Sequence, residues 1–216
     1  MKQIDNENDF NFFKVKTGNI KSGILYRSSS PLTGGADREI KEKLAVDAKI
    51  NCIINLVNSS SVIEGLSKEV KWYHKLYSDG NVICLPMTLT VTSKVNEKKI
   101  KAALQFMINH KSPYLIHCFA GIDRTGFFIM LLEALMGASM KEIITTYLSA
   151  LPNDKNILES LNNHCQVSGL LKQMKSIFYA DNLFKVNIQS VVEQYLMCNF
   201  NLSPDEILQL KNVLKG

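Results

Sequence analysis

Short apolar runs rich in β-branched residues alternate along this chain with segments of helical periodicity. The clearest runs cover residues 50–57 (INCIINLV), 82–87 (VICLPM) and 114–118 (YLIHC), and residues 24–26 (ILY) form a weaker one. Runs of this length and composition are typical of strands buried on both faces of a sheet. Helices between successive strands supply the long connections that parallel strands need. The pattern therefore predicts an α/β fold with a mostly parallel central sheet flanked by helices.

The segments between and after these runs predict the covering helices. Residues 37–48 precede the first clear strand. Residues 95–108 place five apolar side chains on one helical face: Val95, Ile100, Ala103, Leu104 and Met107. Residues 125–136 are apolar nearly all round, which predicts a central, buried helix.

The C-terminal third is predicted to be all helical. Two capping boxes mark helix starts, at Ser139 with Glu142 and at Ser203 with Glu206. Pro204 strengthens the second start, because proline suits the first helical position. Residues 153–184 are also expected to be helical, with boundaries that the pattern leaves open.

A single domain over residues 1–216 is the simplest organisation. The chain has no internal repeat, no low-complexity segment and no linker rich in proline or glycine. With 46% hydrophobic and 21% charged residues, it has the composition of an ordinary globular protein. Disorder, a collagen helix and a coiled coil are excluded as descriptions of the whole chain.

Charge and hydropathy limit the expected partners and location. The net charge is +5, but the basic residues form no dense run, so no nucleic acid is expected to bind. The strongest apolar run, residues 127–132, is far too short to span a bilayer, so no stable membrane insertion is expected. Residues 1–9 are polar and do not resemble a secretory signal, which favours a cytoplasmic location and leaves signal-independent secretion open.

The five cysteines do not form a recognisable framework. Their number is odd, their spacing is wide and no C-x-x-C occurs, so neither a disulfide scaffold nor a zinc ribbon is indicated. The histidines show no metal-binding spacing, and no metal or other cofactor is expected. Cys165 or Cys198 could protect Cys118 through a disulfide, although inert buried thiols are the expected state.

One segment has the composition of an anion-binding loop. HCFAGIDRTG, residues 117–126, follows the last predicted strand and leads into the buried helix. Amide groups in a tight strand-to-helix loop form an anion nest, to which the helix N-terminus adds partial positive charge. Gly121 and Gly126 permit the required backbone turns, and Arg124 can hold two oxygens through its planar fork. Phosphate or sulfate is expected to occupy this loop.

Cys118 begins the segment and is the candidate nucleophile. The amides, the helix end and Arg124 all favour its thiolate over a thiol of ordinary pKa, about 8.5. Attack on phosphorus would give a phosphocysteine, which water would then hydrolyse. Thr125 is placed to offer its hydroxyl to the sulfur, and no metal is required. The remaining candidate substrate-binding residues are His117, Phe119, Ala120, Gly121, Ile122 and Gly126.

The segment resembles the signature loop of the cysteine-dependent protein tyrosine and dual-specificity phosphatases. Its Asp-Arg-Thr-Gly ending is similar to that of the bacterial atypical branch. The likeness continues in GILYRS at residues 23–28, IITTYLS at 143–149 and residues 191–214. The resemblance implies the three-layer phosphatase fold and a phosphorylated protein or small phosphate ester as substrate, phosphotyrosine first and phosphoserine or phosphothreonine after it. It also implies that His117 helps fix the loop and tune the thiol.

Two departures from this branch bear on specificity and on the scaffold. Ile122 stands where the branch usually has a lysine that is associated with highly charged substrates, which makes phosphoinositides the second choice. Asn55-Leu56-Val57 replaces the usual Asp-Leu-Arg at the end of a strand, so an ion pair from that position, with Arg27 for example, is not expected.

The general acid does not follow from the usual position of a carboxylate in tyrosine phosphatases. Tyrosine phosphatases usually carry an aspartate on the loop after the strand at residues 82–87, but here Glu97 is the sole carboxylate between Pro86 and Cys118. In the bacterial branch the loop aspartate is the proposed acid, which predicts Asp123 as the acid and then the base for water. Asp123 could instead orient the loop or Arg124, and Asp79 is a lesser candidate.

Other classes of function remain open on the sequence. A catalytically weak module that docks phosphoproteins would use the same loop without turnover. A cysteine-loop sulfurtransferase does not fit the Arg-Thr-Gly and the helix that follows it. An arsenate reductase would need a second cysteine close to Cys118, which sequence distance cannot show.

Overall fold

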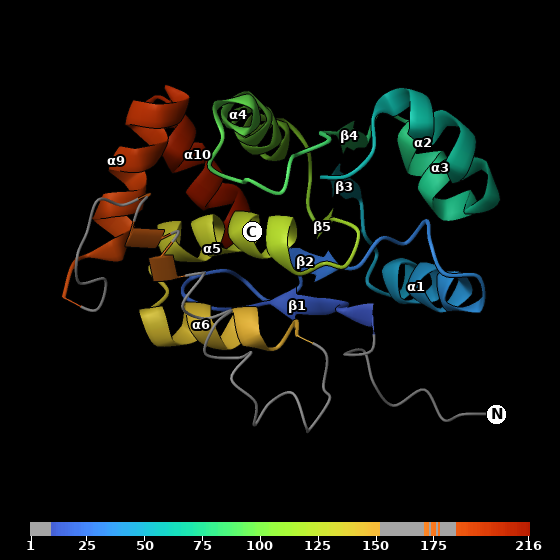
Figure 1. Cartoon of the computed structure of the whole chain (residues 1–216), viewed down its shortest axis with the longest axis horizontal. Coiled ribbons are helices and arrows are strands. Elements are labelled where there is room, and N and C mark those ends of the chain that lie inside the picture. The colour runs from blue at the N-terminus through green and yellow to red at the C-terminus, as the bar shows by residue number, and fades with distance from the viewer. Residues whose placement is uncertain (1–9, 152–170, 173, 176, 178–184) are drawn as a thin grey trace.

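The computed structural model describes residues 10–151, 171–172, 174–175, 177 and 185–216. Five strands form one sheet in the order β1-β2-β5-β3-β4 (Figure 1). Their bounds are Phe13–Val15 for β1, Leu25–Ser28 for β2, Cys52–Asn55 for β3, Val82–Cys84 for β4 and Tyr114–His117 for β5. β1 is antiparallel to β2, and every other pair is parallel. The predicted α/β fold with a mostly parallel sheet is confirmed.

Strand register places the last residues of the central strands side by side. His117 of β5 is paired with Ser28 of β2 on one side and with Asn55 of β3 on the other. Asn55 is paired in turn with Cys84 of β4. The carboxyl edge of the sheet is therefore a row of polar side chains, with His117 at its centre.

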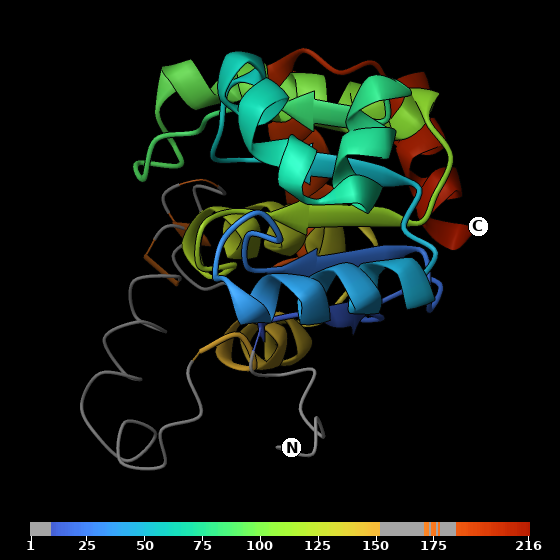
Figure 2. The same ribbon diagram turned by 90° about the vertical axis from the view of Figure 1, so that its right-hand side faces the viewer.

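Helices cover both faces of the sheet (Figure 2). One face packs against α1 (Ala36–Asp47), α2 (Ser60–Leu66) and α3 (Lys71–Ser78), with a 3-10 turn at Ser67–Glu69 between the last two. On the other face, α4 (Lys94–Asn109) and α5 (Asp123–Leu135) share one hydrophobic core with the sheet. α9 (Ile188–Phe200) packs on α4 and α5, α10 (Pro204–Lys215) packs on α4, and α6 (Met140–Leu148) packs on α5. Because both faces are covered, β2, β3 and β5 are buried along their whole length.

The helix predictions are confirmed where local signals are strong. Both predicted capping boxes form, and Pro204 occupies the first turn of α10. Every residue of α5 from Thr125 to Leu135 is buried, as its apolar sequence predicts. The prediction for Val95 was wrong: its side chain is 62% exposed, because in the first turn of α4 the buried position is taken by its neighbour Asn96.

Some elements were not predicted from the sequence, and some predictions fall on residues that the structure does not describe. β1, α2 and α3 were not predicted, because with three, seven and eight residues each is too short to give a clear periodic pattern. The predicted helical segment 153–184 lies largely outside the described residues, as does Cys165. The Thr-rich residues 88–93 form the loop between β4 and α4.

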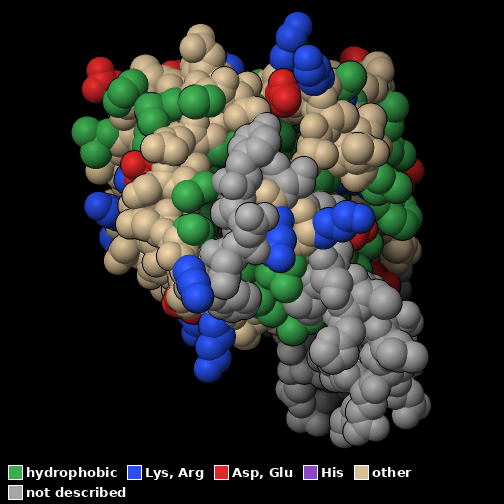
Figure 3. All heavy atoms as spheres, turned by 60° about the vertical axis from the view of Figure 1, so that its left-hand side comes forward, with side chains coloured by type: hydrophobic (Ala, Val, Ile, Leu, Met, Phe, Trp, Pro, Cys, Tyr) green, Lys and Arg blue, Asp and Glu red, His purple; other side chains and the backbone are tan. Residues whose placement is uncertain are grey.

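Surface and hydropathy observations concern only the described part of the chain. None of its helices is both long enough and apolar enough to cross a bilayer. On the face shown in Figure 3, Lys and Arg side chains are scattered among hydrophobic and uncharged ones, and do not gather into one patch.

Candidate active site

The loop that carries Cys118 leaves the middle of the carboxyl edge of the sheet. β5 ends at His117, and α5 begins at Asp123, so residues 118–122 form a tight strand-to-helix loop. In open α/β sheets, ligands bind outside the carboxyl ends of the strands, where neighbouring connections diverge. The sulfur side of this loop is deep, since Cys118 is only 2% exposed, while Phe119 at the rim is 62% exposed.

Four consecutive carbonyl groups of the loop accept hydrogen bonds from groups outside it. The donors are His117 Nδ1 to Cys118 at 3.5 Å, Ser30 N to Phe119 at 3.0 Å, Asn11 Nδ2 to Ala120 at 2.8 Å and Arg27 Nη2 to Gly121 at 2.6 Å. In a planar trans peptide the C=O and the following N–H point in opposite directions. The amides of residues 119–122 are therefore turned away from these donors.

The Gly121 amide shows where this inner side lies. Its N–H donates to Cys118 Sγ over 3.2 Å, so at least one inward amide already faces the sulfur. An amide directed at sulfur stabilises a thiolate, and a set of such amides forms a nest for an anion. The predicted anion nest thus has the backbone orientation that it needs.

Gly121 could not be replaced by a residue with a side chain without moving the backbone. Its φ is +75°, in the left-handed region, and a Cβ atom there would lie 2.5 Å from the Ser28 carbonyl oxygen. The end of β2 therefore presses directly on the loop and leaves room only for glycine.

Arg124 is anchored at one end of its guanidinium. Its Nη1 donates to the carbonyl oxygens of Leu56, at 3.3 Å, and Met87, at 3.2 Å, which follow β3 and β4. Its Nε is buried and has no hydrogen-bond partner among the described residues. This arrangement leaves the Nε side of the fork for an anion, which is the edge that grips two oxygens at once.

Two other predicted site residues, Thr125 and Gly126, lie in the first turn of α5. Thr125 is fully buried, but its hydroxyl has no partner among the described residues, so the predicted bond to the sulfur is not formed here. The helix backbone holds this side chain in place, and the sulfur accepts from the Gly121 amide instead. Gly126 is buried beneath the ring of Tyr147, which a Cβ atom would meet at 3.0 Å.

Asp123 is the first residue of α5 and is exposed. Within the described part of the chain, no hydrogen bond or ion pair of its carboxylate is formed, so it does not brace Arg124 there. Its charge contributes to raising the pKa of Tyr147, after the larger effect of burial. Asp79 lies before β4, at the amino edge of the sheet, and is paired with Lys75.

The charged group that acts on the buried Arg27 side chain was missed by the sequence patterns. Arg27, which is fully buried, donates to the Gly121 carbonyl, and the largest effect of a charge on its pKa comes from Glu133 of α5 rather than from any group at position 55. Burial lowers the pKa of Arg27 to about 10, while the charges of Glu133 and Cys118 raise it. Glu133 accepts from the Thr17 hydroxyl. The one available signal was Glu133 itself, a lone charge in an apolar helix.

Glu133 should make stability depend on pH in a defined window. Burial raises the pKa of Glu133 to about 7 from an ordinary value of 4.5. As pH rises from 4.5 to 7, the unfolded chain loses this proton and the folded chain keeps it, so stability falls through the window and levels off above it. Between these two pH values, we expect the free energy of unfolding of Glu133→Gln to fall by about 3 kcal/mol less than that of the wild type.

The measurement is the free energy of unfolding in urea at several pH values for wild type and Glu133→Gln. The exposed Glu64 of α2 provides the control, Glu64→Gln, whose curve should follow the wild type. Parallel curves for wild type and Glu133→Gln across the window would show that this carboxyl is not the group responsible.

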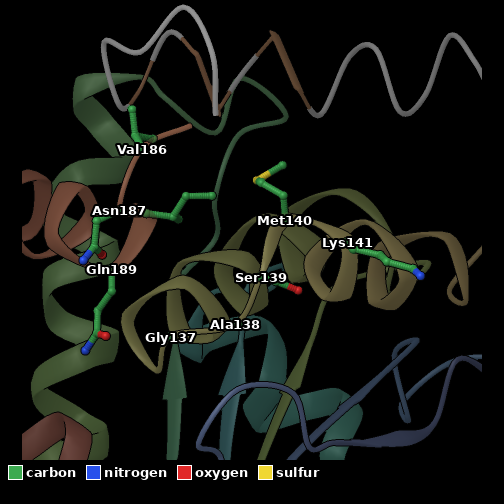
Figure 4. A pocket seen from close by; sticks show the side chains of 9 residues that line it. Gly137, Ala138, Ser139, Met140, Lys141, Val186, Asn187 and Gln189 are labelled. Carbon is green, nitrogen blue, oxygen red and sulfur yellow. The ribbon is translucent and has the colours of Figure 1, made fainter. Parts of the chain in front are cut away.

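A surface pocket of about 370 Å³ lies elsewhere (Figure 4). It is lined by residues 137–141, at the end of α5 and start of α6, and by residues 186–189 at the start of α9. The 13 residues of α5 separate it from the Cys118 loop by about 20 Å. Among the described residues, no three His, Cys, Asp or Glu side chains are grouped so as to hold a metal ion.

The mostly parallel sheet, the cysteine in a loop of inward amides and the arginine in the following helical turn are the features that the resemblance to phosphatases leads us to expect. Comparison with protein-family sequence models agrees: the tyrosine phosphatase family matches residues 1–215. The chain belongs to the tyrosine phosphatase family, and its activity is that of a phosphatase hydrolase. A search of curated proteins finds no match.

Proposed function

We propose that the protein hydrolyses phosphate monoesters through a phosphocysteine on Cys118, and that protein phosphotyrosine is its main substrate. The observation that carries the proposal is the set of four outward-held carbonyls, with the Gly121 amide directed at the sulfur. A loop so arranged binds a tetrahedral anion directly over a nucleophile. Phosphoserine and phosphothreonine are the next substrates in order.

The reaction runs in two displacements at phosphorus. In the first, the Cys118 thiolate forms the S–P bond, the ester P–O bond breaks, and the leaving oxygen takes the proton of Asp123. In the second, water forms a new P–O bond and gives its proton to Asp123, while the S–P bond breaks and returns the thiolate. Arg124 and the loop amides stabilise the charge on the three equatorial oxygens in both steps.

The depth of the sulfur favours an aryl ester. Cys118 is 2% exposed, so the phosphorus must travel below the rim to reach it. A phosphotyrosine ring is long enough to do so, whereas the short side chain of phosphoserine would bring the peptide backbone against the rim. The exposed ring of Phe119 offers an aromatic contact at that rim. Ile122, in place of a lysine, offers no extra charge to a phosphoinositide.

The decisive experiment combines turnover with trapping. The full chain is incubated in chelator with para-nitrophenyl phosphate, phosphotyrosine and phosphoserine peptides, and phosphoinositides, and acid-quenched samples are examined by mass spectrometry. We expect fastest turnover of phosphotyrosine and a phosphoryl group on the peptide that contains Cys118. Tight peptide binding without turnover would instead establish a docking module, and preference for the lipids would establish the phosphoinositide alternative.

A reducing compartment suits this chemistry. Cys118 and the other described cysteines, Cys52, Cys84 and Cys198, are all free thiols. In an oxidising compartment, the thiolate would be converted to a disulfide or a sulfenic acid. We therefore place the protein in the cytoplasm as part of the proposal.

The variant Asp123→Asn tests the role of Asp123 as the general acid. Without a proton donor, the leaving group must depart as the free anion, so Asp123→Asn should lower kcat for phosphotyrosine peptide by about 10²–10⁴. The loss should be smaller for an aryl phosphate whose leaving group is stable as an anion. The decline of kcat with rising pH that a general acid produces should also flatten.

Two other carboxylates provide the controls. Asp79→Asn changes a residue at the far edge of the sheet, and Glu97→Gln changes the first turn of α4. Both variants should keep the wild-type kcat and pH profile. If Glu97→Gln showed the loss instead, the acid would belong to the segment after β4, as in most tyrosine phosphatases.

A further inference from the structure

Three buried side chains form a hydrogen-bonded chain that ends beside the nucleophile. Asn55, at the end of β3, donates from Nδ2 to Tyr73 Oη of α3 over 3.0 Å. Tyr73 Oη lies 3.1 Å from Nε2 of His117, the residue before Cys118. All three side chains have an exposed fraction of 0%. No step of the proposed reaction uses them directly.

The direction of this chain follows from the orientation of the Asn55 amide. Its Oδ1 accepts from the backbone N–H groups of Val57, at 2.9 Å, and Asn58, at 3.0 Å. The Nδ2 group must therefore face Tyr73, and an amide nitrogen can only donate. Tyr73 Oη accepts from Asn55, and among the described residues His117 Nε2 is the acceptor within reach of its single proton, so Tyr73 is assigned as the donor to His117.

The ring proton of His117 is then left on Nδ1. The pKa of His117 is lowered to about 3, chiefly by burial and also by the charges of Lys41 and Arg124, which outweigh the opposing hydrogen bond to the Cys118 carbonyl. The ring is therefore neutral and carries one proton. Nδ1 lies 3.5 Å from the Cys118 carbonyl oxygen, a long contact that is attractive only if Nδ1 holds the proton. That carbonyl is the first of the four whose outward orientation turns the loop amides inward.

We propose that Asn55 is a positioning residue, which fixes the Nδ1–H tautomer of His117 through Tyr73 and thereby holds the Cys118 peptide in its binding orientation. The inference rests on the proposed function only for its kinetic consequence. The tautomer and the binding of inorganic phosphate can be measured whether or not the protein turns over a substrate.

Asn55→Asp reverses the chain while keeping its shape. One carboxylate oxygen still accepts the two backbone amides, but the other can only accept. Tyr73 must then donate to position 55 and accept from His117 Nε2–H. Nδ1 loses its proton and places a lone pair against the Cys118 carbonyl. We expect kcat/KM, and the affinity for inorganic phosphate, to fall by about tenfold or more.

Long-range ¹H–¹⁵N spectra of the histidine rings report the tautomer directly. We expect His117 to be protonated on Nδ1 in the wild type, and on Nε2 or on both nitrogens in Asn55→Asp. Asn58→Asp is the matched control. It adds the same charge three residues away, at a side chain whose oxygen already accepts a hydrogen bond from Asn55 Nδ2. That variant should keep the wild-type tautomer and phosphate affinity.

The outcomes separate this inference from the proposed function. A wild-type His117 protonated on Nε2, or the same tautomer in wild type and Asn55→Asp, would overturn the inference. Equal losses in Asn55→Asp and Asn58→Asp would also overturn it, because charge alone would then explain them. If Asn55→Asp does not fold, Tyr73→Phe serves instead, and it should leave His117 as a mixture of tautomers. Absence of turnover with the predicted tautomer and phosphate binding would overturn only the proposed function.

Discussion

Cys118→Ser should lower turnover of an aryl phosphate by about 10⁴-fold or more while leaving phosphate binding nearly intact. A serine hydroxyl is not ionised at neutral pH, so the loop loses its nucleophile and keeps its donors. The change replaces one buried atom, and the Gly121 amide that faces the sulfur remains available to an anion. The measurements are kcat with para-nitrophenyl phosphate and the Kd of a phosphotyrosine peptide by calorimetry.

Cys84→Ser is the matched control for this prediction. Cys84 is also a partly buried thiol at the carboxyl edge of the sheet, but Asn55 of β3 separates it from His117. Its variant should turn over substrate at the wild-type rate. Retention of more than a few per cent of turnover by Cys118→Ser would exclude a phosphocysteine on this residue. Loss of both turnover and peptide binding would indicate that the loop itself had collapsed.

Arg124→Lys is expected to show the second largest loss, about 10³-fold in kcat/KM. Lysine keeps the positive charge but has no planar fork, so it cannot hold two phosphate oxygens side by side. It also cannot bond both the Leu56 and Met87 carbonyls and still reach an anion. Steady-state kinetics with a phosphotyrosine peptide measure the effect.

The structural part of this effect can be separated from the chemical part. Losing the two carbonyl contacts of Arg124 should lower the free energy of unfolding by about 1–3 kcal/mol, which urea titration measures. Arg38→Lys is the control, because Arg38 forms an exposed ion pair with Glu69 away from the loop. It should change kcat/KM by less than about twofold. A similar kcat/KM for Arg124→Lys and wild type would remove Arg124 from the phosphate grip.

The loop residues could be predicted because their chemistry is contiguous. Cys118, Gly121 and Arg124 lie within seven consecutive residues, between a recognisable strand and a recognisable helix. Backbone amides, a helix N-terminus and a guanidinium at this spacing are typical of an anion site, which is why the site could be proposed from the sequence. For the same reason the two capping boxes were predictable, since each depends on four neighbouring residues.

The supports of the loop could not be predicted, because each joins residues that are far apart in the chain. Asn11 and Arg27 hold the carbonyls of Ala120 and Gly121 across 109 and 94 positions. Such contacts arise only when β5 is inserted between β2 and β3, an order that no local pattern encodes. The opposite charge for Arg27 likewise comes from the middle of an apolar helix.

The amino-acid sequence by itself determined which atoms can do chemistry: the Cys118 sulfur, the Arg124 guanidinium and the amides between them. Tertiary structure alone decided how those atoms are held, through Arg27 beneath Gly121 and through Asn55 and Tyr73 behind His117. The physical reason is that covalent spacing sets a local loop, whereas burial and hydrogen-bond direction depend on which strands become neighbours.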